Sequence, residues 1–443
     1  MKSSGYIKPL EAYAGEKTFA DPAFMNNKTE PVHRWSPWVA GFSKFFVNDA
    51  LNNYTTKGDL VLDPFTGVGT TLLESLLHDR NTMGFEINHY AKFSTEVKLK
   101  CLDYDVDSLE RALDRFDQFM KEKIEGTAEP IATPPPGFRS KIAFYSPNVL
   151  RQVLFVLDYI NEIDTEDVRN FFKVAFASTM VNYSNYSYEP SLGTRRGSGK
   201  KDITDYDVKG AISNKISEMI KDVKIVQKKH PQPHMEHTVF HDSFFNYAKY
   251  LEEFTVDLII TSPPYLNNYH YNRNTRPQLF WLDLITSTKE LKELEESNFG
   301  TYWQTARDYD LIELNRCPPN SDLQSVIDEI RSKNPEKGTY GGNGWANYCA
   351  TYFNDCYKFA EGIHYSLKEG KTALVVIGNS IVQGVPVATD QFFAEICEDV
   401  GLHLEDIHIP RTARVGNSIT SSGPRMKSKT KQNLYEAIVE ITN

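Results

Sequence analysis

The sequence predicts an α/β protein whose buried strands form a parallel sheet. Short apolar runs that end in turn residues recur along the chain, which is typical of strands covered on both faces. Helical patterns, notably residues 70–79 and 352–367, fall between several of these runs. The predicted strands are residues 59–62, 82–85, 238–240, 256–260, 372–377, 403–409 and 434–441.

Two long stretches interrupt this alternation. Residues 103–232 have a mostly helical pattern, with a proline-rich break at 133–137 and a polar segment at 183–201, and residues 266–347 are irregular. Loops of this length inside a compact sheet are usually functional or form subdomains. We therefore divide the chain into an N-terminal segment (1–58), three parts of one core (59–102, 237–265 and 351–443) and two insertions (103–236 and 266–350).

The composition indicates a globular protein. Of the 443 residues, 40% are hydrophobic and 24% are charged, which allows one large core or two ordinary ones. No run of about 18 apolar residues occurs, and the first residues lack the apolar stretch of a secretory signal. We therefore expect a soluble protein of the cytoplasm, without a membrane partner.

The five cysteines predict neither a disulfide framework nor a zinc site. Cys101, Cys317, Cys349, Cys356 and Cys397 are widely spaced and odd in number, and they include no CxxC pair. Free thiols, mostly in the core, are the simplest interpretation.

The charge distribution limits the way in which the chain could bind nucleic acid. A net charge of −10 excludes a protein that coats nucleic acid indiscriminately, because such binding needs many cationic contacts to phosphate. Four cations nevertheless lie within residues 195–201, and four more within residues 425–431. Because local patches matter more than the total, DNA remains a candidate partner.

The segment VLDPFTGVGTTLLESLL has the features of a ligand-binding loop at the end of a strand. It places Asp63 at the strand end, then Gly67 and Gly69, then a helix that begins near Thr70. Glycines let the backbone approach a ligand at the carboxyl edge of the sheet. A dinucleotide fingerprint is less favoured, because Leu72 replaces its third glycine.

Glu86 ends the next apolar run, 23 residues after Asp63. A carboxylate at this place in a doubly wound fold can hold the two hydroxyls of a ribose. The alternative is that both acids are ordinary caps at strand ends.

The segment VDLIITSPPYLNNYHYNR contains the candidate catalytic loop. Two consecutive prolines cannot continue a central strand, so Pro263 and Pro264 force a fixed extended turn at the carboxyl edge of the sheet. This turn offers carbonyl acceptors, the hydroxyl of Ser262 and the aromatic ring of Tyr265. A planar base that carries an amino group would suit the combination, although a plain strand terminator is the alternative.

Together, the two motifs resemble those of the DNA amino-methyltransferases, which pair a DPFxGxGT loop with a [DNS]PP[YFW] loop. The S-P-P-Y form is characteristic of the branch that methylates N4 of cytosine, whereas D-P-P-Y or N-P-P-Y is usual for N6-adenine enzymes. The resemblance implies a Rossmann-like class I methyltransferase fold: a mostly parallel seven-stranded sheet, here with a large helical insertion. It also implies S-adenosyl-L-methionine as the cofactor and site-specific methylation of double-stranded DNA.

The family pattern also implies which residues form each site. WSPWVAGF partly matches the segment that caps the cofactor, and His241-Asp242-Ser243 resembles the strand end that meets the adenine ring. The implied cofactor-binding residues are Trp35, Ser36, Pro37, Phe42, Asp63, Pro64, Phe65, Thr66, Gly67, Gly69, Thr70, Thr71, Glu86, Ile87, Asp242, Ser243 and Thr261. The implied catalytic residues are Ser262, Pro263, Pro264 and Tyr265.

The implied mechanism is a direct in-line transfer. The Ser262 hydroxyl and the Pro263 carbonyl would accept hydrogen bonds from the amino group, and Tyr265 would stack on a base flipped out of the duplex. No metal and no covalent intermediate are required. Cytosine-C5 methylation would need a cysteine in the catalytic loop, and Cys317 lies far from it in the sequence.

Cations near both insertions are the candidates for holding DNA, because arginine can read guanine edges and lysine can hold phosphate. The segment 183–201 mixes tyrosines, glycines and cations, although a solvated loop is the alternative. Asn267, His270 and Asn272 follow the catalytic loop, and Arg411, Arg414 and the 425–431 cluster could add phosphate contacts. The predicted DNA-binding residues are Arg195, Arg196, Lys200, Lys201, Asn268, Arg273 and Arg276.

Three other functions remain open from the sequence: an N6-adenine DNA methyltransferase, a tRNA guanine-N2 methyltransferase and a catalytically inactive DNA-binding homologue. The resemblance also raises a cognate restriction endonuclease, or another defence-system component, as a partner. In a prokaryote, the protein would be associated with the nucleoid.

Overall fold

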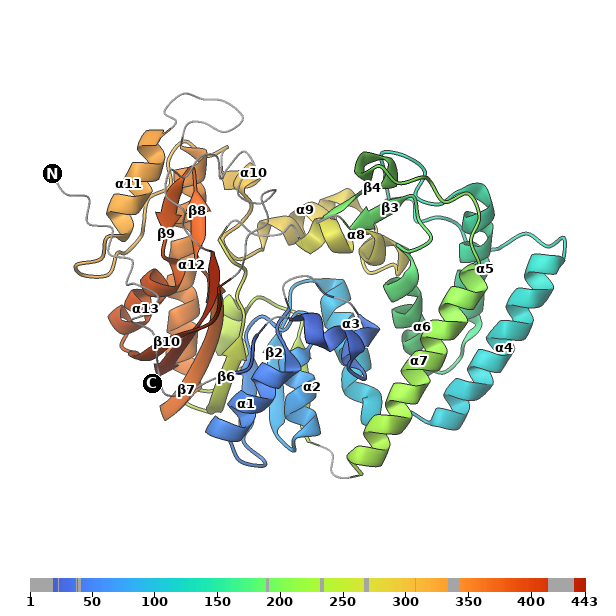
Figure 1. Ribbon diagram of the computed structural model, residues 1–443, viewed down its shortest axis with the longest axis horizontal. Coiled ribbons are helices and arrows are strands. Elements are labelled where there is room, and N and C mark those ends of the chain that lie inside the picture. Colours follow the sequence, from blue (N-terminus) through green and yellow to red (C-terminus); the bar gives the residue numbers. More distant parts are fainter. Residues whose placement is uncertain are drawn as a thin grey trace.

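The computed structural model describes residues 19–22, 24–36, 38, 41–188, 191–231, 235–266, 271–306, 308–333, 343–412 and 434–443. Within these residues the core is a seven-stranded sheet in the order β10-β11-β7-β6-β1-β2-β5 (Figure 1). β11 runs antiparallel to both of its neighbours, and the other adjacent strands are parallel. The strands are β1 (Leu60–Asp63), β2 (Asn81–Phe85), β5 (His237–Phe240), β6 (Val256–Thr261), β7 (Leu367–Gly378), β10 (His403–Thr412) and β11 (Tyr435–Thr442).

Helices cover both faces of this sheet because its central strands are apolar on both sides. In β1, Val61 packs on the side of helix α1 (Lys44–Tyr54), and the next residue, Leu62, packs on the opposite side. That opposite side is covered by α12 (Gly344–Ser366) and α13 (Thr389–Asp399). Successive side chains of a strand point to opposite faces, so a strand buried on both sides appears as a continuous apolar run.

Two helices follow β1 and β2, the strands that end at Asp63 and just before Glu86. α2 (Thr70–Leu77) follows β1, and its first turn is preceded by Gly69 in the left-handed conformation. α3 (His89–Leu99) follows β2, and the Asn88 side chain accepts hydrogen bonds from the backbone N–H groups of Tyr90 and Ala91. Both helix starts therefore lie at the carboxyl edge of the sheet.

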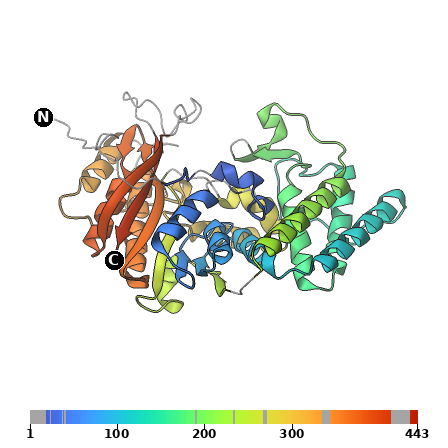
Figure 2. The same ribbon diagram turned by 60° about the horizontal axis from the view of Figure 1, so that its bottom comes forward.

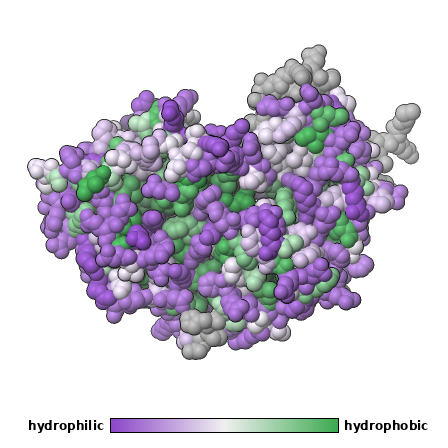
Figure 3. All heavy atoms as spheres, turned by 180° about the vertical axis from the view of Figure 1, so that it is seen from behind, coloured by the Kyte–Doolittle hydropathy of each residue, from purple (hydrophilic) through white to green (hydrophobic). Residues whose placement is uncertain are grey.

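Four long helices form a bundle beside the sheet. They are α4 (Val106–Glu125), α5 (Pro147–Glu162), α6 (Glu166–Thr179) and α7 (Val208–Lys229), and a short 3-10 turn, η4 (Lys100–Leu102), leads from α3 toward them. Figures 1 and 2 both place α4 at the opposite end of the molecule from β10. Seen from behind, apolar side chains gather toward the middle of the molecule and hydrophilic ones occupy its rim (Figure 3).

The polar segment 183–201 is not a simple loop. It forms a hairpin of β3 (Tyr186–Tyr188) and β4 (Leu192–Thr194), followed by the 3-10 turn η5 (Arg195–Ser198). The hairpin packs on helix α8 (Tyr271–Trp281), which begins shortly after the catalytic loop. The Tyr188 hydroxyl donates to the Asn274 carbonyl, and the Leu192 N–H donates to Asn274 Oδ1. This docking orders a segment whose composition predicts only a loop.

A buried carboxylate joins the helical bundle to the N-terminal part of the chain. Asp222 of α7 is fully buried and accepts hydrogen bonds from the Val32 N–H, the Trp35 indole N–H and the Arg34 guanidinium. Its partners lie in and beside the 3-10 turn η3 (His33–Trp35), which follows η2 (Phe24–Thr29). Val32 has φ 65°, a strained value for a β-branched residue, and the bond to Asp222 helps to hold it there.

The second irregular stretch is largely helical. It contains α8, α9 (Thr288–Glu296), α10 (Trp303–Ala306) and α11 (Leu323–Lys333). A second small hairpin, β8 (Ser380–Val382) with β9 (Val385–Val387), follows β7.

The α/β class and the mostly parallel sheet are confirmed. Each predicted strand segment forms a strand, although β7 begins at Leu367 rather than at residue 372, because the chain passes directly from α12 into it. The five cysteines are free, and all but Cys317 are buried. In the described part of the chain, no helix has the length and apolar character needed to cross a bilayer, and no three potential metal ligands cluster.

Candidate active site

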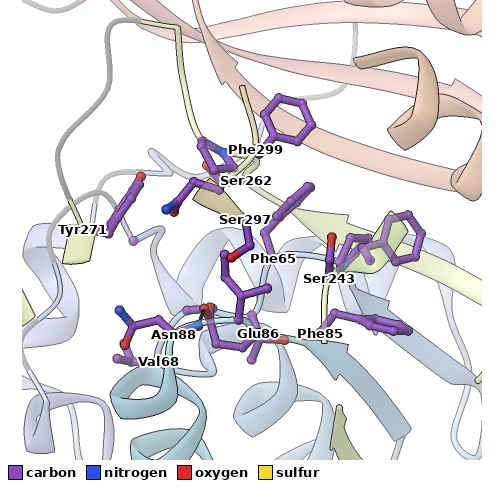
Figure 4. Close-up of a pocket in the computed structure, with 18 of the residues that line it drawn as sticks. Phe65, Val68, Phe85, Glu86, Asn88, Ser243, Ser262, Tyr271, Ser297 and Phe299 are labelled. Atoms are coloured by element: carbon purple, nitrogen blue, oxygen red, sulfur yellow. Dashed lines mark hydrogen bonds between the residues drawn. The ribbon is translucent and has the colours of Figure 1, made fainter. Parts of the chain in front are cut away.

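A pocket opens at the carboxyl edge of the sheet, with an empty volume of about 910 Å³, its mouth included (Figure 4). Its walls come from the β1–α2 loop, the end of β2, the segment after β5, the segment after β6 and the second insertion. The described residues that line it are Trp38, Gly41, Phe42, 64–68, Thr70, 85–88, 242–245, Ser262, Pro264, Tyr271, Asn272 and 297–299.

Two left-handed glycines shape the loop between β1 and α2. Gly67 has φ 53° and Gly69 has φ 80°. A Cβ on Gly69 would lie 2.5 Å from Thr95 Cγ2, and one on Gly67 would lie 3.3 Å from Trp38 Nε1. The loop is therefore both conformationally and sterically restricted to glycine at these two positions.

Side chains of helix α3 hold the same loop by donating hydrogen bonds to two of the loop's carbonyl groups. Thr95 Oγ1 donates to the Gly67 carbonyl at 3.1 Å, and Lys98 Nζ donates to the Val68 carbonyl at 3.0 Å. Lys98 is 1% exposed, and burial lowers the pKa of its ammonium to about 7. A buried lysine under the loop had no signal in the sequence, since it lies outside every motif.

Glu86 is the carboxylate that faces the pocket from β2. Its Oε2 accepts the Gly67 N–H at 2.8 Å, and its Oε1 accepts the Asn88 N–H at 2.7 Å. Burial raises the pKa of Glu86 to about 7, and these hydrogen bonds oppose the rise. The carboxylate is thus held rigidly with lone pairs left for further donors.

Asp63 lies below the pocket surface. Its Oδ1 accepts the Thr261 hydroxyl at 2.6 Å and the Phe65 N–H at 3.0 Å, while its buried Oδ2 has no hydrogen-bond partner among the described residues. Burial raises the pKa of Asp63 to about 6. Because Thr261 ends β6 and immediately precedes Ser262, this bond links the glycine loop to the catalytic loop.

Asp242 closes the pocket beyond β5. Burial alone would raise its pKa, but hydrogen bonds from the Tyr250 hydroxyl, the Asn246 amide and the Ser243 N–H lower it. Ser243 then caps the 3-10 turn η6 (Phe244–Lys249). An ionised carboxylate therefore stands at this end of the pocket.

Ser262 and Pro264 of the candidate catalytic loop line the pocket, whereas Tyr265 turns toward the sheet. Ser262 Oγ donates to the Tyr265 hydroxyl at 3.4 Å, and that hydroxyl donates to Glu436 of β11 at 3.4 Å. The Tyr265 ring would lie 3.3 Å from a Cβ on Gly378. With its proton directed to Tyr265, the Ser262 hydroxyl keeps its lone pairs for other donors.

Comparisons with known proteins identify sequences that are similar to this chain. A family model described as DNA methylase matches residues 18–96. The chain is 23% identical to the type II methyltransferase M.BsoBI of Geobacillus stearothermophilus, over 90% of this chain and 84% of that protein. It is 24% identical to M.AvaI of Nostoc sp. over 93% and 87%, and 23% identical to M.MvaI of Kocuria varians over 86% and 84%. Together, the matching family model and the type II relatives support a DNA amino-methyltransferase of the N4/N6 family.

Methyltransferases of this family use S-adenosylmethionine as the methyl donor, and the pocket fits that group. Its described lining contains the carboxylates Glu86 and Asp242 but no lysine, arginine or histidine. The cofactor carries a sulfonium and an ammonium against one carboxylate, so a negatively charged pocket complements it. A Cβ on Gly67 would lie 3.3 Å from Trp38 Nε1, so a side chain there would crowd Trp38 at the pocket.

Not every residue predicted to bind the cofactor lines the pocket. Phe42, Pro64, Phe65, Thr66, Gly67, Thr70, Glu86, Ile87, Asp242 and Ser243 line it. Trp35 is instead fully buried against Phe171, and Ser36 is fully buried beside Ser94. Gly69, Thr71, Thr261 and Asp63 support the loops from behind, and Pro37 lies outside the described residues.

The predicted DNA-binding residues differ in their exposure and in their hydrogen-bond partners. Arg196 is exposed and paired with Asp202, and Arg195 Nε donates to the Lys201 carbonyl. Lys200, Lys201 and Arg273 are exposed. Arg276 is half-buried, lies over the rings of Phe138 and Phe280 and donates to the Arg139 carbonyl, so it serves packing. Asn267, Asn268, His270, Arg414 and the 425–431 cluster lie outside the described residues, as does the Arg411 side chain.

Several pocket residues were not predicted. Trp38 stacks on Tyr271 with ring centroids 6.0 Å apart, and residues 297–299 enter the pocket after α9. Phe299 is held there by Phe65 and Phe359. Trp38 belongs to a recognisable motif, but Ser297 and Asn298 have no sequence signal, because only the return of α9 brings them to the pocket.

Proposed function

We propose that this methyltransferase transfers a methyl group to the exocyclic N4 amino group of cytosine in double-stranded DNA. The observation that carries the proposal is Ser262: it heads the S-P-P-Y loop, lines the pocket and directs its own proton to Tyr265. Its lone pairs can then accept a hydrogen bond from an amino group. Relatives named as type II methyltransferases support site-specific action on DNA.

The residues of the pocket have separate roles in this proposal. Glu86 accepts hydrogen bonds from the ribose, and Asp242 and Ser243 receive the adenine end. When bound, the cofactor supplies an electrophilic methyl group on a sulfonium. Ser262 and the Pro263 carbonyl orient the amino group toward that methyl, and holding reactants in line can contribute about 7 kcal/mol or more.

Tyr265 has a different role from base stacking in this proposal. Because its hydroxyl is engaged by Ser262 and Glu436, it positions the serine. Tyr271 and Trp38, which line the pocket, are better placed to provide an aromatic surface for the flipped base.

We also propose that the helical insertion (103–236) recognises DNA through Arg195, Arg196, Lys200 and Lys201, and that Arg273 of α8 adds a further contact. Arg195 is partly exposed and the other four cations are exposed. The hairpin that precedes most of them docks on α8 beside the catalytic loop. A cognate restriction endonuclease is the partner that the type II names of the relatives favour.

The base specificity is tested by digesting DNA from cells that express the protein and analysing its nucleosides by mass spectrometry. We expect N4-methylcytosine. N6-methyladenine in its place would overturn the cytosine assignment but not the family, and single-molecule sequencing of the same DNA would give the sequence context.

The role of Ser262 is tested by Ser262→Ala. We expect the rate of methyl transfer to fall about a hundredfold, because the amino group loses its orientation. Cofactor affinity should stay within a few-fold of wild type. Ser366→Ala is a matched control, since that hydroxyl donates to a helix carbonyl at the other edge of the sheet. Full activity of Ser262→Ala would contradict the mechanism.

A further inference from the structure

Asn272 lines the pocket, and its side-chain amide carries a buried donor without a partner among the described residues. Asn272 lies in the first turn of α8, lines the pocket and is 1% exposed. Its Nδ2 is buried and has no hydrogen-bond partner within the described part of the chain. Leaving a buried donor unpaired costs free energy, and such groups in native proteins are usually satisfied by a ligand, water or ion.

The orientation of this amide follows from the cap of α3. Asn88 Oδ1 accepts the N–H groups of Tyr90 and Ala91, both at 3.1 Å, so the oxygen of Asn88 must face the helix. Asn88 Nδ2 therefore faces α8, where it donates to Asn272 Oδ1 at 3.0 Å and to Thr275 Oγ1 at 2.9 Å. With its oxygen engaged by a donor, Asn272 has its nitrogen left over.

The neighbours of Asn272 show that it lies close to Glu86 and to the glycine loop between β1 and α2. Asn88, its hydrogen-bond partner, donates its own backbone N–H to Glu86. Tyr271, the preceding residue, stacks on Trp38, which covers Gly67. In Figure 4, Tyr271 lies above Asn88 and Val68. Since no cation lines the described pocket, the oxygens of a bound cofactor depend on neutral donors such as this amide.

We propose that Asn272 is a cofactor-contacting residue whose Nδ2 donates to an oxygen in the ribose and methionine half of S-adenosylmethionine. The acceptor is a ribose hydroxyl or the methionine carboxylate. This inference rests on the proposed placement of the cofactor in the pocket. It assigns a binding role to the second insertion, in a helix that also holds the β3–β4 hairpin.

The test is calorimetric binding of S-adenosylhomocysteine and of 5′-methylthioadenosine, which lacks the amino-acid end. We expect Asn272→Ala to weaken S-adenosylhomocysteine binding about tenfold, the effect of removing one buried hydrogen bond. A similar weakening with methylthioadenosine identifies a ribose hydroxyl as the acceptor. A weakening confined to S-adenosylhomocysteine identifies the carboxylate. Asn272→Asp, which keeps the acceptor for Asn88, should weaken binding as well and serves if the alanine variant does not fold.

Two control variants separate a direct contact from an indirect effect. Thr275→Val removes the other acceptor of Asn88 but leaves the Asn272 amide, and it should stay within twofold of wild type. Asn274→Ala changes the same residue type on the same helix, at a position outside the described pocket lining, and it should do likewise. Unchanged affinity of Asn272→Ala, or an equal weakening in Thr275→Val, overturns the inference. If Glu86→Gln also leaves affinity unchanged, the cofactor placement itself is wrong.

Discussion

At Glu86, burial and hydrogen bonding act in opposite directions on one carboxyl group. Burial raises its pKa to about 7, although two backbone N–H groups stabilise the charged form. Near neutral pH the group is therefore divided between its two protonation states. The carboxyl group accepts hydrogen bonds from hydroxyl groups more strongly when it is ionised than when it is protonated. The affinity for the cofactor should therefore depend on pH.

We predict that the affinity for S-adenosylhomocysteine increases as the pH rises through about 7, and that Glu86→Gln flattens this increase. The stability of the free protein should respond in the opposite direction. Because the folded-state pKa lies above the ordinary value of 4.5, the group stabilises the fold at low pH and loses that contribution as the pH rises through about 7. Calorimetry and thermal unfolding across this range measure both effects. A wild-type profile with the same slope as that of Glu86→Gln would exclude Glu86 as the titrating group.

Single residues were predictable where the motif itself dictates the geometry. Gly67 and Gly69 have left-handed backbone, and Glu86 and Ser262 directly follow β2 and β6, so these positions relative to the strands are the ones that the motifs predict. Trp35 was misplaced because a carboxylate 187 residues away draws its indole into the core. Such a partner leaves no mark in the local sequence.

At the scale of elements, α8 connects the pocket with the β3–β4 hairpin. Its Asn272 and Thr275 meet Asn88, while its Asn274 holds the hairpin through Tyr188 and Leu192. The cations of η5 follow the hairpin directly. Their guanidinium groups bond to residues 201 and 202 rather than to α8, so they can be changed without disturbing the docking.

We predict that replacing Arg195 and Arg196 with alanine weakens DNA binding while cofactor affinity stays unchanged. If both arginines bind phosphate, the weakening should be equal for all sequences, and the slope of the salt dependence should become shallower by about one unit for each phosphate released. Titrations of cognate and scrambled duplexes at two salt concentrations measure this. Arg111→Ala on α4 is a matched control, since that arginine is also exposed but lies in another helix of the bundle. Unchanged affinity would remove η5 from the DNA-binding surface.

The predicted elements differ in accuracy for a physical reason. Strands such as β6 are largely apolar and buried along their length, so burial and sequence pattern coincide. The β3–β4 hairpin depends on contacts with α8, more than 80 residues further along the chain, and its own residues are polar enough to be a loop. The entry of residues 297–299 into the pocket after α9 likewise depends on the packing of Phe299 against Phe65.

At the scale of the whole molecule, Asp222 joins the helical bundle to the N-terminal segment. This carboxylate is fully buried and holds three residues of the N-terminal segment, which continues to Trp38 and Phe42 at the pocket. Removing one partner of a buried, hydrogen-bonded ion pair is costly because the other group remains unpaired.

We predict that Asp222→Asn destabilises the protein by about 3 kcal/mol and also weakens cofactor binding. Denaturant unfolding and calorimetry measure the two effects. Glu218→Gln, one turn earlier on α7 and 3.9 Å from Arg34, should change stability by less than about 1 kcal/mol, because that pair is long and partly exposed to solvent. Equal effects of the two substitutions would show that the Asp222 bonds do not join the two parts as described.

If residues 103–236 recognise DNA as proposed, the Asp222 contact limits how freely this region can be exchanged between related enzymes. A chimera that replaces residues 103–236 as a block keeps the Val32 N–H, the Arg34 guanidinium and the Trp35 indole but discards their shared acceptor. Such a graft would carry the new sequence preference together with a damaged N-terminal segment. The Asp222 carboxylate is preserved if the chimera retains α7 of this protein, or if the enzyme that supplies the graft has an acidic residue at the equivalent position. A successful exchange should therefore begin and end within α4–α6 and the hairpin.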